Sequence, residues 1–161
     1  MENLVTMHKW LGLSAIVLVL DLWTKHWIQA HIAYGEHVPL TSFFDLVLFH
    51  NEGAAFSFLA GAGGWQRFMF SVIAIIASGV IVYLLRKYPE RKLFSLGLSL
   101  VLGGALGNLY DRVTLGYVVD FIFLHYQREY YWPAFNVADS AISGGVVLLL
   151  IDSFRKPAQP S

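Results

Sequence analysis

The sequence predicts an all-α membrane protein with four transmembrane helices and a small β-rich cradle on the extracytoplasmic side. Of its 161 residues, 57% are hydrophobic and 14% are charged, and the mean hydropathy is +0.57. A soluble domain has about 25% charged residues, so this composition favours an integral membrane protein. The other two observations are four apolar segments of spanning length and an uneven distribution of Lys and Arg.

The apolar segments define the predicted helices. We interpret the first as a retained membrane helix and not as a signal peptide, because Asp21 and Lys25 directly follow its apolar run and no clean small-x-small cleavage site stands at the right distance. The second and third each have 18 uncharged residues, close to the ~20 that span the hydrocarbon core. The predicted helices cover Trp10–Ile28, Phe68–Leu85, Leu93–Tyr110 and Asn136–Phe154.

The basic residues predict the orientation of these helices. With the N-terminus inside, seven of the eleven Lys and Arg residues fall on the cytoplasmic side, as the positive-inside rule requires. Both termini are therefore expected to be cytoplasmic. Four tryptophans then lie at the outer interface, where an aromatic belt is expected. These basic residues are Lys9, Arg86, Lys87, Arg91, Lys92, Arg155 and Lys156, and the tryptophans are Trp23, Trp27, Trp65 and Trp132.

Two longer segments, 29–64 and 113–135, lie on the outer side in this topology. Val38–His50 is rich in β-branched and aromatic residues, which predicts a short strand or hairpin at the membrane surface. The second outer segment is also expected to be partly extended. No repeat or low-complexity tract divides the chain, so we expect one membrane-embedded domain over residues 1–161 and a monomer.

Composition also excludes several classes of function. The formal net charge is zero and there is no basic run, so a nucleic-acid partner is not expected. The absence of cysteine excludes disulfides, thiolate metal ligands and cysteine nucleophiles. The six histidines do not have the spacing of a known metal-ligand motif. We therefore expect no metal and no organic cofactor.

The predicted topology brings polar residues from three helices to one depth near the outer leaflet boundary. Asp21 and Lys25 share a helix face at i, i+4 and are expected to pair. Asp111 and Arg112 are likewise interpreted as an ion pair that holds helices together. Asn108 and Asn136 are expected to hydrogen-bond exposed backbone or the backbone of a ligand, and Gly103 and Gly107 to allow close helix packing. The histidines are expected to lie at the surface or the membrane interface. The other acids are expected to be solvated or interfacial, and they are Glu36, Asp45, Glu52, Glu129 and Asp152.

Asp120 and Asp139 differ from the other acids. Neither has a cation at a local spacing, and both stand among apolar neighbours. Burial raises the pKa of a carboxyl group, and a second carboxyl close by raises one of the two further. Two such acids can share a proton, so that one activates water while the other polarises a carbonyl. Spacing alone does not favour this catalytic pair over a structural pair or an ion-conducting pair.

The polar motifs as a set resemble those of the lipoprotein signal peptidases, also called type II signal peptidases. Five blocks occur in the family's order over about residues 10–152. They are Asp21-Leu22-Trp23-Thr24-Lys25, Asn51-Glu52-Gly53-Ala54-Ala55-Phe56, Gly103-Gly104 through Gly107-Asn108 to Asp111-Arg112, Val119-Asp120-Phe121, and Phe135-Asn136-Val137-Ala138-Asp139.

This resemblance implies an intramembrane aspartic endopeptidase of the bacterial inner membrane, with Asp120 and Asp139 as its catalytic dyad. The implied substrate is a prolipoprotein with diacylglycerol on its lipobox cysteine, cut just before that cysteine while its acyl chains remain in membrane lipid. Globomycin-type inhibitors are implied to occupy the site. Asp21, Lys25 and Asp111 are implied to stabilise the fold. The residues implied to bind substrate or support the site are Asn51, Gly53, Asn108, Arg112, Asn136 and Ala138.

Three other functions fit the sequence less well. A small proton or cation transporter could use Asp120 and Asp139 as its ion path, but such acids are expected deeper in the helices. A non-enzymatic scaffold leaves the two unpaired acids unexplained. A lipid hydrolase or phosphatase is expected to have a histidine-based or cationic phosphate site, for which Arg112 alone is too little.

Overall fold

The computed structural model describes residues 2–53, 64–127 and 129–154. Residues 54–56 of the second block lie outside these residues, as do Arg155 and Lys156 in the tail at 155–161. Within the described residues, four helices are long and apolar enough to cross a membrane, as predicted. They are α1 (Glu2–His31), α2 (Trp65–Lys87), α3 (Lys92–Thr114) and α4 (Val137–Phe154).

The helices extend beyond most of the apolar segments that predicted them. The largest difference is in α1, which has 30 residues and continues at both ends past the predicted Trp10–Ile28. Hydropathy marks only the part of a helix that lies in hydrocarbon, whereas the backbone hydrogen bonds of a helix continue through charged residues at its ends. At the C-terminal end of α1, Ile28 and the following Ile32 pack with Leu48, Val119 and Phe121 of the sheet.

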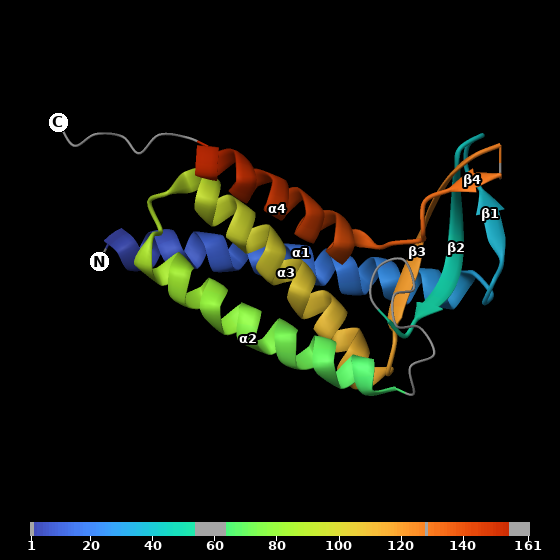
Figure 1. Cartoon of the computed structure of the whole chain (residues 1–161), viewed down its shortest axis with the longest axis horizontal. Coiled ribbons are helices and arrows are strands. Elements are labelled where there is room, and N and C mark those ends of the chain that lie inside the picture. Colours follow the sequence, from blue (N-terminus) through green and yellow to red (C-terminus); the bar gives the residue numbers. More distant parts are fainter. Residues whose placement is uncertain (1, 54–63, 128, 155–161) are drawn as a thin grey trace.

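Helix α3 is the centre of the bundle and packs against each of the other three helices (Figure 1). Its glycines allow this close packing. A Cβ atom at Gly103 would lie 2.6 Å from the backbone oxygen of Ser14 on α1, and one at Gly104 would collide with the backbone oxygen of Ala138 on α4. A Cβ atom at Gly107 would collide with the carboxylate of Asp21. The predicted packing role of Gly103 and Gly107 is confirmed.

The cradle is a four-stranded antiparallel sheet in the order β1-β2-β3-β4. It lies at the end of the bundle opposite to the start of α1 and the end of α4 (Figure 1). In the central pair, Phe49 is opposite Asp120 and Asn51 is opposite Val118. The prediction of a hairpin within Val38–His50 is confirmed in outline. The strands are β1 (His37–Pro39), β2 (Phe44–Asn51), β3 (Val118–Tyr126) and β4 (Tyr130–Tyr131).

One polar cluster in the sheet contradicts the prediction for Asp45 and His125, which are both buried, whereas His37 in the same cluster is exposed as predicted. Asp45 is buried, with His125 Nε2 at 3.1 Å and His37 Nδ1 at 3.2 Å from its two carboxylate oxygens. These three residues come from β2, β3 and β1. This cluster could not be predicted from the spacing of the three residues in the sequence, because their contact depends on the register of the strands.

Candidate active site

Asp120 and Asp139 belong to different elements and are joined by Asn136. Asp120 lies in β3 and Asp139 in the first turn of α4. The Asn136 side-chain amide donates to Asp120 Oδ1 at 2.8 Å, and its backbone N–H donates to Asp139 Oδ2 at 3.3 Å. In return, Asn136 Oδ1 accepts from the backbone N–H of Asp139 at 2.9 Å. This reciprocal pair has the geometry of a capping box, so the start of α4 fixes one carboxylate next to the other.

Each remaining carboxylate oxygen also accepts a hydrogen bond from an asparagine. Asn51 Nδ2 donates to Asp120 Oδ2 at 2.9 Å, and Asn108 Nδ2 donates to Asp139 Oδ1 at 2.8 Å. Asn51 is oriented in turn, because its Oδ1 accepts from the backbone N–H of Gly53 at 3.0 Å. All four carboxylate oxygens therefore have a fixed N–H donor and still have a lone pair to offer to water or substrate.

Arg112 of α3 binds the turn that follows β2. Its Nη2 donates to the backbone oxygen of Gly53 at 3.2 Å, and its Nη1 donates to that of Asn108 at 3.4 Å. The predicted pair between Asp111 and Arg112 does not form. Asp111 binds Lys25 instead, because α1 packs along the face of α3 that carries Asp111.

Lys25 is the centre of a buried charge cluster. Its Nζ lies 2.7 Å from Asp21 Oδ2 and 2.9 Å from Asp111 Oδ2, and it donates to Asn108 Oδ1 at 3.0 Å. Only 1% of Lys25 is exposed, and both acids are also buried. The three contacts match the three N–H donors of an ammonium group, which is the condition under which a buried charge is tolerated.

The surroundings of Asp120 make its proton affinity unusual. Burial, together with the negative charge of Asp139, raises the pKa of Asp120 from its usual 3.8 to about 7. Hydrogen bonds from Asn51 and Asn136 oppose this effect by favouring the charged form. Near neutral pH the pair can therefore hold one proton, which is the state that combined acid and base catalysis requires.

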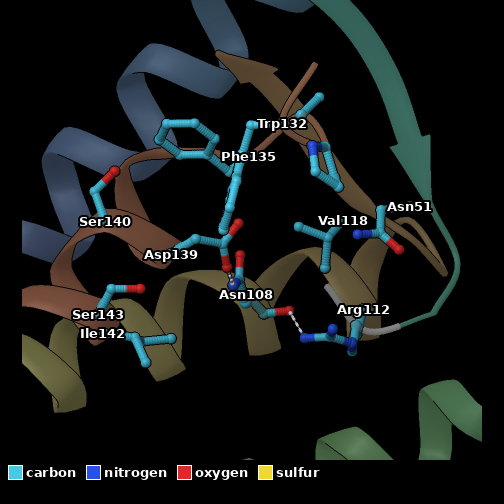
Figure 2. Close-up of a pocket in the computed structure, with 12 residues that line it drawn as sticks. Asn51, Asn108, Arg112, Val118, Trp132, Phe135, Asp139, Ser140, Ile142 and Ser143 are labelled. Atoms are coloured by element: carbon cyan, nitrogen blue, oxygen red, sulfur yellow. Dashed lines mark hydrogen bonds between the residues drawn. The ribbon is translucent and has the colours of Figure 1, made fainter. Parts of the chain in front are cut away.

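Two cavities meet at the pair. One has a volume of about 420 Å³ and lies between the C-terminal end of α3 and the start of α4, with Asp139, Asn108 and Arg112 in its wall (Figure 2). The other has a volume of about 800 Å³, lies against the sheet and reaches Asp120. Within the described residues, no cluster of three His, Asp or Glu could hold a metal ion. The arrangement suits hydrolysis by two carboxylates.

Comparison with known proteins agrees with this geometry. The model of the signal peptidase (SPase) II family matches residues 13–155. The chain belongs to this family. It is 54% identical over 147 residues to the lipoprotein signal peptidase of Ralstonia nicotianae, covering 91% of this chain and 84% of the relative. It is 52% identical over 146 residues to that of Acinetobacter baumannii, covering 90% and 82%.

Solved structures show the same fold. A bacterial membrane enzyme determined by the in meso method at 2.3 Å resolution superposes with a TM-score of 0.80 at 31% identity, covering 96% of this chain and 95% of the other. A second, at 1.9 Å resolution, gives a TM-score of 0.78 at 30% identity, covering 92% and 94%. As a member of the signal peptidase II family, the chain is a multi-pass membrane peptidase whose substrates are prolipoproteins.

The structure brings every predicted site residue into one hydrogen-bonded network, although not always in the expected way. Ala138 is fully buried (0% exposed), so its side chain does not reach a cavity. It contributes its backbone N–H, which donates to Asp21 Oδ1 at 2.8 Å. Sequence reasoning missed this contact and the bond from Val119 N–H to Asp111. The only signal in the sequence was that Val119 and Ala138 directly precede Asp120 and Asp139.

Proposed function

We propose that this peptidase is an aspartic endopeptidase that removes the signal peptide from diacylglyceryl-modified prolipoproteins by cutting just before the lipidated cysteine. Asp120 and Asp139 are its proposed catalytic residues. The observation that supports this most strongly is that both carboxylates are bound to one asparagine, Asn136, where the two cavities meet.

In the proposed reaction, one carboxylate takes a proton from a water molecule as the water oxygen attacks the carbonyl carbon of the scissile bond. The other carboxyl group is protonated and donates a hydrogen bond to the carbonyl oxygen. A proton then passes to the leaving nitrogen, and the C–N bond breaks. The pKa of about 7 at Asp120 supports a single shared proton at neutral pH.

The position of the site fits a substrate held by lipid. The polar residues belong to the C-terminal parts of α1 and α3 and to the start of α4. Figure 1 shows that these ends of the helices lie beside the sheet. We propose that this level corresponds to the outer leaflet of the bacterial inner membrane, with both termini cytoplasmic. The cleaved bond is then near the headgroups while the acyl chains stay in lipid.

Globomycin binding and a monomeric state are further expectations.

The test is a cleavage assay with purified protein in detergent or lipid. It compares a diacylglyceryl-modified prolipoprotein with the same chain lacking the lipid, and mass spectrometry identifies the products. We expect only the lipidated chain to be cut, and the new N-terminus to be the lipidated cysteine. Cleavage at another bond, equal cleavage of both chains, or no cleavage of the lipidated chain would overturn the proposal.

A further inference from the structure

The two cavities at the aspartate pair have different surroundings. The cavity that contains Asp139, here called the helix cavity, continues along α4 past Ser140, Ile142 and Ser143 (Figure 2). The cavity that contains Asp120, here called the sheet cavity, is bounded by β2, β3 and β4 and by Tyr34 after α1. One therefore extends toward the membrane-spanning part of the chain, and the other extends over the extracytoplasmic sheet.

We propose that the sheet cavity binds the first residues of the mature lipoprotein, those that follow the lipidated cysteine, while the helix cavity holds the end of the signal peptide. This inference rests on the function proposed above. A peptide whose scissile bond lies between the two carboxylates has to leave the pair in two directions. Its apolar signal segment belongs with the membrane helices, so its polar mature segment is directed over the sheet.

Aromatic side chains line the sheet cavity. Phe123 is its centre, with Tyr131 stacked on it at 5.7 Å and Phe49 packed edge-on at 6.5 Å between ring centroids. At the other side, the Tyr34 ring lies 4.8 Å from that of His50. Tyr131 and Tyr34 are each 66% exposed, which leaves their faces available to a peptide. Aromatic rings with a polar edge bind peptide side chains at a low cost in side-chain entropy.

The boundary between the cavities also offers backbone to an extended peptide. Pro133 and Ala134 line both cavities. On either side of them, the N–H groups of Trp132 and Phe135 donate to β3, at 2.9 Å to Leu124 and 3.1 Å to Ile122. Among the hydrogen bonds of the described residues, none involves the N–H or C=O of Ala134. A peptide that crosses from one cavity to the other can pair with these groups.

The test uses two neighbouring tyrosines of β4 and two substrates. Tyr131 lines the sheet cavity, whereas Tyr130, which is similarly exposed at 71%, does not. Both substrates have the same signal peptide and lipidated cysteine. One ends at that cysteine, and the other continues for roughly six residues, which span about 20 Å when extended. Cleavage rates give KM and kcat for the wild type, Tyr131→Ala and Tyr130→Ala.

We expect Tyr131→Ala to raise KM about fivefold for the longer substrate, with kcat and the KM of the shorter substrate unchanged. Tyr130→Ala should match the wild type on both. Equal effects of Tyr131→Ala on the two substrates, no effect on either, or the same effect from Tyr130→Ala would overturn the inference while leaving the proposed function intact. Failure of the wild type to cut either substrate would instead overturn the proposed function, and this inference with it.

Discussion

The carboxylate of Asp21 on α1 accepts a hydrogen bond from the backbone N–H of Ala138 in α4, 117 residues later, at 2.8 Å. Asp111 accepts in the same way from Val119 in β3, at 3.1 Å. Ala138 and Val119 directly precede the two proposed catalytic aspartates, and Lys25 binds both Asp21 and Asp111. The buried charges therefore set the distance between the two backbone segments that hold the pair.

Replacing Lys25 with methionine should destabilise the fold and abolish cleavage together. The change leaves two buried carboxylates without their cation, which costs about 3–5 kcal/mol in comparable cases. Thermal unfolding in detergent and cleavage of the lipidated substrate measure the two effects. Lys9→Met is the matched control, since Lys9 is an exposed lysine of the same helix. Unchanged unfolding and activity in Lys25→Met would show that the charge cluster does not position the site.

Gly107 should accept no side chain. A Cβ atom there would collide with the Asp21 carboxylate and move it away from Lys25 and Ala138. We expect Gly107→Ala to lower both the unfolding temperature and the cleavage rate. Gly144→Ala is the control, because nothing lies within 4 Å of a Cβ atom at that position of α4. If the two variants behave alike, close packing at Gly107 is not required.

The hydrogen bond from Asn51 should tune the proton affinity of Asp120. Because this bond favours the charged carboxylate, Asn51→Ala should raise the pKa of Asp120 above its value of about 7. Loss of the shared proton should lower activity on the alkaline side of the pH profile. In the variant, this fall should move to higher pH and the maximum rate should drop. A profile of kcat/KM against pH measures the effect, and an unshifted alkaline limb would contradict it.

Asp120 should also make stability depend on pH. Its pKa is about 7 in the folded state and 3.8 as an ordinary aspartate, so the folded state keeps a proton that the unfolded state releases. Folding stability therefore falls as pH rises from about 4 to 7, by at most about 4 kcal/mol. Asp120→Asn should remove this dependence. The unfolding temperature of Asp120→Asn minus that of the wild type should be larger at pH 8 than at pH 4. Effects of the new amide that do not depend on pH cancel in this comparison.

Much of the architecture could be predicted because membrane helices are marked by hydropathy alone. The four helices and the hairpin are found where the sequence places them, and the C-terminal ends of α1 and α3 bring Lys25 and Asn108 together as expected. The choice of partners could not be predicted. Asp111 pairs with Lys25 and not with its neighbour Arg112, because helix rotation decides which side chains meet.

The sheet shows a second limit of the sequence. Asp45 resembles any surface acid until the register places His37 and His125 beside it. The backbone donors Val119 and Ala138 likewise could not be predicted from a motif, because every residue except proline supplies a backbone N–H. Motifs thus identify the side chains of the site, whereas the contacts that position them depend on packing.

The proposed dyad is tested most directly by Asp120→Asn and Asp139→Asn in the cleavage assay with a lipidated prolipoprotein. These near-isosteric changes remove the ionisable proton and keep an oxygen acceptor. We expect each variant to unfold cooperatively, to bind globomycin and to lose cleavage by at least about 10²-fold. Asp152→Asn, at the opposite end of α4, should retain wild-type activity. Near-normal cleavage by either Asp120→Asn or Asp139→Asn would contradict the account, because that acid would then be structural.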